Sequence, residues 1–228
     1  MKRNQSGFTL IEIAIVLVII GLLLGGVLKG QELINSAKVK NLATDFRNIP
    51  VYIYGYQDKF RALPGDDPNL TAHLTGATPC TNAPTVTAGK CSVGNGLIDG
   101  NWYDTTVASE SYVFWQHVRL AGLASGPTDT TLASTVYLPV NAAGGAIGIQ
   151  SNNGFNSTNS LAAVSLMTGS YIICSQGILG KFVKQLDTTM DDGNTDTGSM
   201  RTFIGTGTQS QSTISILDGN TYTVCMGV

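Results

Sequence analysis

Residues 8–28 read FTLIEIAIVLVIIGLLLGGVL, an almost unbroken apolar run in which only Thr9 and Glu12 are polar. About 20 apolar residues are what a helix needs to cross a bilayer. A carboxylate inside such a run costs about 2.5–3.5 kcal/mol to insert. Glu12 is therefore expected to have a partner that offsets this cost.

The residues that flank this run favour an N-terminus on the cytoplasmic side. Lys2 and Arg3 precede the run, and Lys29 is the only basic residue that follows it immediately. The run is too long for the apolar core of an ordinary secretory signal, and no A-x-A-like cleavage site follows Leu28. A plain membrane anchor explains the hydrophobicity and the orientation, but it does not explain Glu12.

The composition of the chain is typical of an extracytoplasmic, loop-rich domain. The sequence has 228 residues, of which only 12% are charged, and the part outside the apolar run is long enough to bury a core. The net charge is −2. Residues 72–160 contain only two basic side chains, Lys90 and Arg119. We therefore expect no nucleic-acid partner.

Four cysteines favour disulfides, because their number is even and a membrane-targeting segment accompanies them. Four cysteines allow three connectivities, of which we favour Cys80–Cys91 and Cys174–Cys225. The first pair would close a short Pro/Thr/Gly loop, and the second would join two expected strands. Zinc is the competing interpretation, but no two cysteines have CxxC spacing.

The start of the chain resembles a known signal. The stretch Gly7-Phe8-Thr9-Leu10-Ile11-Glu12, after a short basic leader and before an apolar helix, is similar to the class III signal of type IV pilins and type II secretion pseudopilins. The resemblance implies that a prepilin peptidase cuts between Gly7 and Phe8 and then methylates the new amino group of Phe8. It also implies that Glu12 pairs with the Phe8 amino group of a neighbouring subunit.

The physical chemistry of these residues agrees with the roles that the resemblance implies. Gly7 gives a protease close access to the backbone. A cationic partner offsets the desolvation of a carboxylate in an apolar bundle, and the freed ammonium of a cleaved chain is such a partner.

The resemblance also implies partners and a location. The partners would be other pilin or pseudopilin subunits, the prepilin peptidase, assembly-platform membrane proteins and, before assembly, the inner membrane. The chain would cross the inner membrane once with a cytoplasmic N-terminus and a periplasmic head, and would then enter a periplasmic pseudopilus or an extracellular pilus.

A helix is predicted to continue past the apolar run. Apolar residues recur at alternating spacings of four and three, which places them on one helix face: Leu42, Phe46, Ile49, Ile53, Tyr56 and Phe60. Pro50 lies inside this stripe and predicts either a kink or two helices that meet near it. The LPGDDP stretch at 63–68 predicts a firm stop, and it resembles a subgroup of prepilin-type proteins with enlarged heads.

The later chain predicts short helices and an antiparallel sheet. Helices are expected at 110–123 and 177–186, and strands at 136–140, 146–149, 161–167, 170–174, 213–217 and 221–228. The Asp218-Gly219-Asn220 turn predicts a hairpin between the last two strands. Strands that follow helices favour the α+β class.

Together with the resemblance, these patterns predict a pilin-like α+β fold. A long N-terminal helix, membrane-spanning in its first half, would pack on a C-terminal head with an antiparallel sheet, extra short helices and large loops. The expected segments are a leader at 1–7, a transmembrane and filament-core helix at 8–28, an amphipathic continuation at 29–63 and a globular head at 64–228.

One acidic segment is a candidate calcium site, because calcium takes six to eight oxygen ligands and the segment carries a glycine turn. Its oxygen-bearing residues are Asp187, Asp191, Asp192, Asn194 and Asp196. Their order is not that of an EF-hand loop, and it does not map onto the calcium loop of some major pseudopilins. The alternative interpretation is a solvated turn.

The sequence carries none of the common catalytic signatures, so we predict no enzyme. Its histidines, His73 and His117, lack neighbours at metal-ligand spacing, and we expect the latter to be packed or exposed on its helix. Three functions stay open: a structural filament subunit, a minor pilin whose loops at 65–109 and 125–160 act as an adhesin or binding module, and an anchored periplasmic monomer.

Overall fold

The computed structural model describes residues 10–81, 91–152, 167–204 and 216–228. The chain divides into two compact units, residues 1–38 and 39–228, which are considered separately. One helix, α1 (Leu10–Phe60), contributes to both units.

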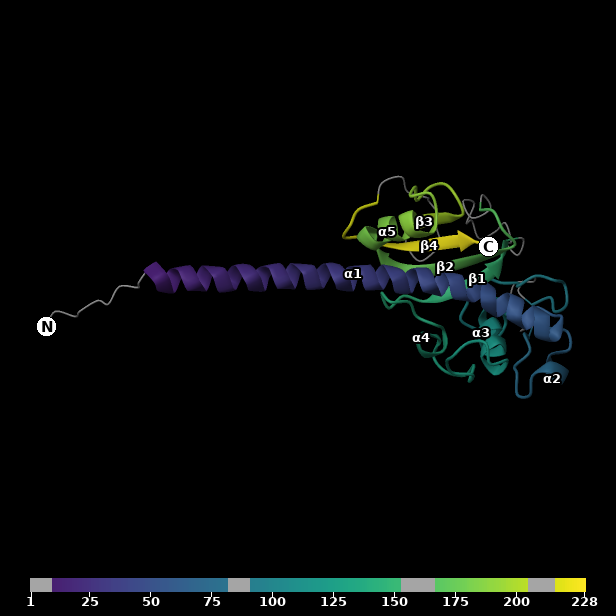
Figure 1. Ribbon diagram of the computed structural model, residues 1–228. Helices are drawn as coiled ribbons and strands as arrows, with labels where there is room; N and C mark the ends of the chain where they lie inside the picture. The colour runs from purple at the N-terminus through teal and green to yellow at the C-terminus, as the bar shows by residue number, and fades with distance from the viewer. Residues whose placement is uncertain (1–9, 82–90, 153–166, 205–215) are drawn as a thin grey trace. The chain divides into compact units, whose positions relative to one another are not determined.

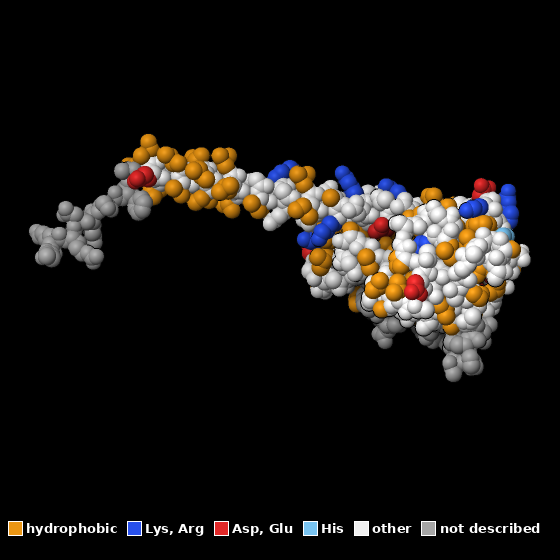
Figure 2. Space-filling view, turned by 90° about the horizontal axis from the view of Figure 1, so that it is seen from below, with side chains coloured by type: hydrophobic (Ala, Val, Ile, Leu, Met, Phe, Trp, Pro, Cys, Tyr) orange, Lys and Arg blue, Asp and Glu red, His pale blue; other side chains and the backbone are white. Residues whose placement is uncertain are grey.

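The part of α1 in the first unit has the character of a membrane span. Its side chains from Leu10 to Leu28 are exposed. The most apolar 18-residue stretch of α1 has a mean hydropathy of 2.8 and is 0% buried, and among the described helices α1 alone is long and apolar enough to cross a bilayer. Hydrophobic side chains cover the visible surface of this segment in Figure 2.

The part of α1 in the second unit buries the predicted stripe. The side chains of α1 that are buried are Val39, Leu42, Ala43, Phe46, Ile49, Ile53 and Tyr56. This confirms the helical spacing of the apolar residues. Pro50 lies within the continuous helix, so the alternative of two helices that meet there is wrong.

A four-stranded antiparallel sheet forms the second layer of this unit (Figure 1). Its strands are β1 (Ile147–Ser151), β2 (Tyr171–Leu179), β3 (Met200–Ile204) and β4 (Thr221–Gly227). Their order is β1-β2-β4-β3, and each neighbouring pair is antiparallel. The α+β prediction is confirmed, although β3 was not expected.

Both faces of the sheet carry apolar side chains. Successive side chains of a strand point to opposite faces, so neighbouring residues of β2 contribute to different clusters. On β2, Ile173 joins the large core cluster that includes the α1 stripe. Its neighbours Ile172 and Cys174 belong to a smaller cluster with Trp102 and Phe203. The sheet therefore lies between two apolar layers and has no fully solvated face.

Among the described residues of this unit there are four further, short helices: α2 (Leu70–His73), α3 (Glu110–Leu120), α4 (Ser134–Tyr137) and α5 (Gly180–Met190). The helix α5 packs on β2, β3 and β4, and α3 contacts β1. In Figure 1, α5 lies on the same side of α1 as β3 and β4. The helices α2, α3 and α4 lie on the opposite side of α1. The helices α3 and α5 match the predicted ones within a few residues.

Two predicted strand features differ from the structure, and two predicted strands are not tested by it. The expected strand at 136–140 is wrong, because α4 ends at Tyr137 and only Val140 makes a β-bridge, to Ala146. The expected hairpin around Gly219 is wrong, because β2 and β3 already occupy both edges of β4. Most of the expected strands at 161–167 and 213–217 lies outside the described residues.

Candidate functional site

The processing residues predicted from the sequence lie at the start of the chain. Gly7 and Phe8 fall outside the described residues. Glu12 lies in the first turn of α1, where the helix macrodipole favours a negative charge. It is the only charged residue between Leu10 and Leu28. The next charged side chains along the helix, Lys29 and Glu32, form an exposed ion pair at 2.7 Å.

The LPGDDP stretch ends α1 through two buried aspartates with separate tasks. The Asp66 carboxylate accepts hydrogen bonds from the backbone N–H groups of Gly94, Asn95 and Gly96. Burial raises the pKa of Asp66, and these three N–H groups oppose that shift. Asp66 thus fastens the 94–96 loop to the end of the helix.

The neighbouring Asp67 ties the last turns of α1 to α2. It accepts hydrogen bonds from the Tyr56 hydroxyl at 2.8 Å and the Asn69 N–H at 2.9 Å, and it pairs with His73 Nδ1 at 2.7 Å. Burial raises the pKa of Asp67, but the bonds from His73 and Tyr56 outweigh burial and hold it below its usual value. The two aspartates therefore stabilise the turn after α1, at the stop that the LPGDDP stretch predicts.

His117 has a structural role in α3. Its Nδ1 accepts a hydrogen bond from the Gly65 N–H at 2.9 Å, so its Nε2–H donates to the Thr78 carbonyl oxygen at 3.1 Å. Burial lowers the pKa of His117, which keeps the ring neutral. A neutral imidazole with both nitrogens in hydrogen bonds has no free position for a metal or a proton transfer.

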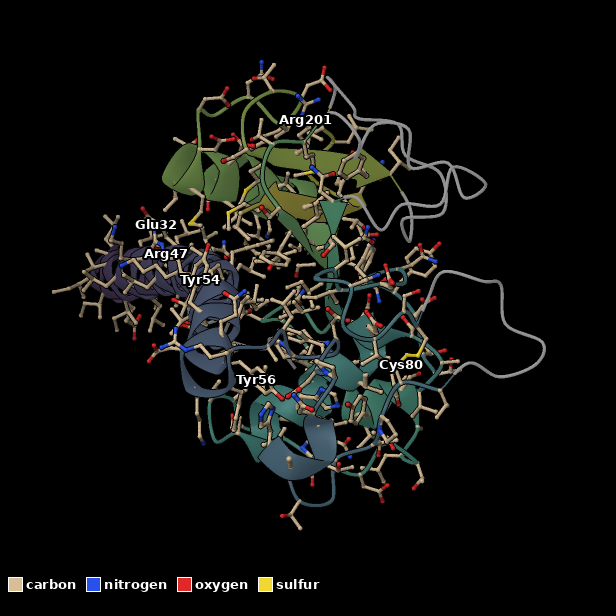
Figure 3. All side chains as sticks on the ribbon, turned by 90° about the vertical axis from the view of Figure 1, so that its right-hand side faces the viewer. Glu32, Arg47, Tyr54, Tyr56, Cys80 and Arg201 are labelled. Atoms are coloured by element: carbon tan, nitrogen blue, oxygen red, sulfur yellow. A yellow bond between two sulfur atoms is a disulfide. The ribbon has the colours of Figure 1, made fainter. Side chains whose placement is uncertain are left out.

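The four cysteines form the two disulfides that were favoured from the sequence, Cys80–Cys91 and Cys174–Cys225. The second joins residues that face each other across β2 and β4. In Figure 3, Cys80 lies on the side of the unit that holds the short helices. On α1, the side chain of Tyr56 is buried, whereas that of Tyr54 is 58% exposed. The first disulfide therefore closes the 80–91 loop, and the second links β2 to β4 within the sheet.

A buried carboxyl lies beside the Cys80–Cys91 disulfide. Glu110 is fully buried, and one of its oxygens lies within 4.8 Å of both sulfurs. Its Oε2 accepts the Asp99 N–H at 2.8 Å. Burial raises the pKa of Glu110 to about 8, with Asp99 and Asp66 adding to the shift. Nothing in the sequence signalled this residue, since a glutamate at a helix start is ordinarily exposed.

The side chains of the acidic segment, the candidate calcium site of the sequence, mostly take part in local hydrogen bonds. Asp191 Oδ2 accepts the Met200 N–H, and Asp192 accepts the Asn194 N–H and the Thr197 hydroxyl. Asn194 in turn accepts the Asp196 N–H. These bonds are those of the solvated-turn alternative, and the described aspartates do not bring three ligand oxygens within 4.8 Å of one another.

Asp187 differs from the rest of this segment. It is 1% exposed, and neither of its oxygens has a hydrogen bond of normal geometry among the described residues. Burial raises the pKa of Asp187 to about 6, and the charges of Asp191 and Asp192 add to the shift while the Gly193 N–H opposes it. Among the candidate calcium ligands, Asp187 is thus the buried one, and its two oxygens have no hydrogen bond of normal geometry among the described residues.

A pocket of about 290 Å³ lies where the 102–105 turn, α4 and the bulge of β2 meet. Its lining includes Trp102 and Tyr103 as well as side chains with uncharged polar groups. Gln176 carried no signal in the sequence, because the bulge that places it is not visible there.

Comparison with known proteins identifies one part of the chain. Residues 2–28 match the family model of the prokaryotic N-terminal methylation motif. Neither a curated protein nor a solved structure gives a match. The motif suggests a structural protein. The chain therefore carries the prepilin-type signal of type IV pilins and pseudopilins, joined to an α+β fold of pilin-like architecture.

Proposed function

We propose that the protein is a structural subunit of a type IV pilus or a type II secretion pseudopilus. The observation that carries the proposal is the prepilin-type signal at residues 2–28, followed by a helix whose first 19 described positions, Leu10 to Leu28, hold one charged residue, Glu12. Such a helix would lie in the membrane before assembly and in the filament core after it.

In this proposal a prepilin peptidase cuts between Gly7 and Phe8 and methylates the Phe8 amino group. Glu12 then pairs with the Phe8 ammonium of a neighbouring subunit. A buried carboxylate without a partner is costly, and an opposite charge with hydrogen bonds offsets the cost. The pairing would therefore offset the cost of burying Glu12 in the filament core, which ties the charge of Glu12 to filament growth.

The same proposal gives the chain its partners and its route. Assembly-platform proteins of the inner membrane would extract the cleaved subunit, with its N-terminus cytoplasmic and residues 39–228 in the periplasm. The two disulfides are consistent with an oxidising compartment.

Substitution of Glu12 tests the proposal. We expect Glu12→Ala to leave membrane insertion and cleavage intact and to remove the protein from sheared or purified filaments. Mass spectrometry of the filament fraction reads cleavage after Gly7, methylation of Phe8 and abundance together.

The matched control is Glu32→Ala, because Glu32 is a carboxylate on the same helix that lies beyond the apolar run and pairs with Lys29. This variant is expected to enter filaments normally. Normal incorporation of Glu12→Ala would refute the pairing, and an uncleaved Gly7–Phe8 bond in the wild type would favour an anchored periplasmic monomer instead.

A second candidate function is that of a minor pilin that binds a ligand at the filament surface or tip. The pocket beside Trp102 and Tyr103 favours it, since binding residues are commonly held on loops by a rigid scaffold.

A further inference from the structure

The pocket beside α4 combines aromatic rings with uncharged polar side chains. It has a volume of about 290 Å³, and Leu138 and Ala146 form part of its wall. The side chains that give it its chemistry are Trp102, Tyr103, Thr105, Ser134, Thr135 and Gln176. None of the residues that line it is an aspartate, glutamate, lysine, arginine or histidine.

A bulge in β2 brings Gln176 to this pocket. The pairing of β2 with β4 shifts register between Ser175 and Ile178, and bulges of this kind re-aim a side chain. Gly177 adopts a φ of +74°, which favours glycine. The Gln176 backbone is held by Asn141, whose Nδ2–H donates to the Gln176 carbonyl oxygen at 2.8 Å.

Two further backbone contacts fix the aromatic side of the pocket. The Trp102 N–H donates to Gln150 Oε1 at 3.0 Å. A Cβ on Gly148 would overlap the Trp102 carbonyl oxygen, so only glycine lets the two segments approach. Tyr103 then packs edge-on against Trp102 with ring centroids 5.5 Å apart. Trp102 is buried, whereas Tyr103 is only partly buried and also lines the pocket, so the tyrosine ring is the one that a ligand can reach.

The polar groups of the pocket remain available for a ligand. Within the described residues, the side chains of Thr105, Ser134, Thr135 and Gln176 make no hydrogen bond, although all four line the pocket. The nearest carboxylate along the chain, that of Asp104, already accepts the Asn101 N–H at 2.7 Å. The pocket thus offers hydroxyl and amide groups without a formal charge.

We propose that this pocket binds a neutral carbohydrate ring. The apolar C–H face of a sugar ring packs on an exposed aromatic ring, and its hydroxyl groups exchange hydrogen bonds with hydroxyl and amide side chains. A charged ligand would be desolvated without a counter-charge in the lining, which is costly. The volume is that of a site for one ring with its substituents, near the lower end of small-molecule pockets.

The proposal is independent of filament assembly, because it concerns only residues of the 39–228 unit. Its test uses the full chain in detergent micelles, with saturation-transfer difference NMR and calorimetry. The neutral probes are methyl β-glucoside, methyl β-galactoside and N-acetylglucosamine. N-Acetylneuraminic acid serves as an anionic probe, and N-acetyl-trialanine amide serves as a peptide probe.

At least one neutral sugar is expected to bind with a Kd of about 1 mM. Tyr103→Ala and Gln176→Ala are each expected to weaken that binding about tenfold, because each removes one of the contacts named above. Tyr54→Ala is the matched control, since Tyr54 is an exposed tyrosine on α1 that does not line the pocket. It should leave binding unchanged.

Thermal melting of each variant checks that it is folded. If Tyr103→Ala does not fold, Gln176→Ala still tests the proposal. Three outcomes overturn the proposal: no neutral sugar binds, only the anionic or the peptide probe binds, or sugar binding survives both pocket substitutions. Loss of filament assembly in the Glu12→Ala variant would not affect any of these readouts.

Discussion

At the scale of single residues, the two most informative side chains are the buried carboxyls of Glu110 and Asp187, which differ in their hydrogen bonds. Glu110 has one firm backbone bond from Asp99 and lies beside a disulfide. Asp187 has no hydrogen bond of normal geometry among the described residues. Both have a raised pKa, so for both the folded state favours the protonated form.

For Glu110, the raised pKa predicts a loss of stability with rising pH. The unfolded carboxyl titrates near 4.5 and the folded one at about 8. Its stabilising contribution is therefore complete below pH 4.5 and is lost as the pH rises to about 8. We expect the free energy of unfolding to fall across this window by an amount on the order of a few kcal/mol.

Urea unfolding of the wild type and of Glu110→Gln at pH 5 and pH 8 measures this effect. The variant should lose less stability between the two pH values than the wild type. Glu32→Gln is the control, because Glu32 is exposed, and it should follow the wild type. An equal loss in the wild type and in Glu110→Gln would contradict the assignment.

For Asp187, the corresponding window is lower. Its contribution is complete below pH 3.8 and is lost as the pH rises to about 6. We expect Asp187→Asn to have a higher Tm than the wild type at pH 7, by a few degrees.

The same melting experiment, repeated with calcium and with a chelator, tests the candidate calcium site. A cation bound by Asp187 would raise the Tm of the wild type at pH 7, a chelator would reverse the rise, and Asp187→Asn would respond to neither. Asp192→Asn is a matched control for the exposed part of the segment. A wild-type Tm that is indifferent to calcium and to chelator, with no heat in a calorimetric titration, refutes the calcium site.

At the scale of elements, the buried Asp66 holds the 94–96 loop to the segment that follows α1. Asp66→Ala leaves the N–H groups of Gly94, Asn95 and Gly96 without their acceptor. Each bond to a charged acceptor contributes about 1.5–3 kcal/mol, and water replaces part of what is lost. We expect a loss of about 3 kcal/mol in the free energy of unfolding.

The matched control is Asp58→Ala, since Asp58 is an exposed aspartate on the same helix. Its effect should stay within about 0.5 kcal/mol. Hydrogen exchange of the 94–96 amides provides a second readout, because these amides should lose protection in Asp66→Ala alone. Unchanged protection would show that the loop is held by other contacts.

The elements also show what the sequence could predict. The α1 stripe, α3, α5 and the strands β1, β2 and β4 follow from local periodicity, because each buries a continuous set of apolar residues. By contrast, β3 (Met200–Ile204) includes Arg201 and follows an acidic turn, so its pattern is weak. It becomes a strand by pairing with β4, which is a tertiary effect.

The wrong predictions have the same origin. The Val136–Val140 run is apolar enough for a strand, but its first residues complete α4 and only Val140 finds a partner. The Asp218-Gly219 turn has hairpin chemistry, yet β4 receives its partners from β2 and β3. The local sequence pattern can predict that a strand exists, whereas the strands with which it pairs are determined by the whole sheet. The candidate pocket was missed for this reason, since it needs a bulge and two distant loops.

At the scale of the whole molecule, residues 39–228 form a unit with its own core. We expect a fragment of these residues to fold without the N-terminal segment. A fragment of residues 64–228 should not fold, because it lacks seven buried side chains of the main cluster. These side chains are Val39, Leu42, Ala43, Phe46, Ile49, Ile53 and Leu63.

Each large buried side chain contributes about 1.5–3 kcal/mol, so their joint loss matches the whole stability of a typical domain. Circular dichroism melting and limited proteolysis of the two oxidised fragments measure the difference. Cooperative melting of the 64–228 fragment would show that the helix stripe is dispensable.

The position of β4 has a consequence for the order of events when the protein is made. Of the strands that the structure describes, β4 comes last in the chain, yet it lies between β2 and β3. The sheet cannot close before residues 221–227 have been made and released to pair with β2 and β3. Because Cys225 lies on β4, the Cys174–Cys225 disulfide can form in its native setting only after this step. If the chain is exported as proposed, a gel-mobility pulse-chase of this disulfide would report when residues 221–227 reach the oxidising compartment.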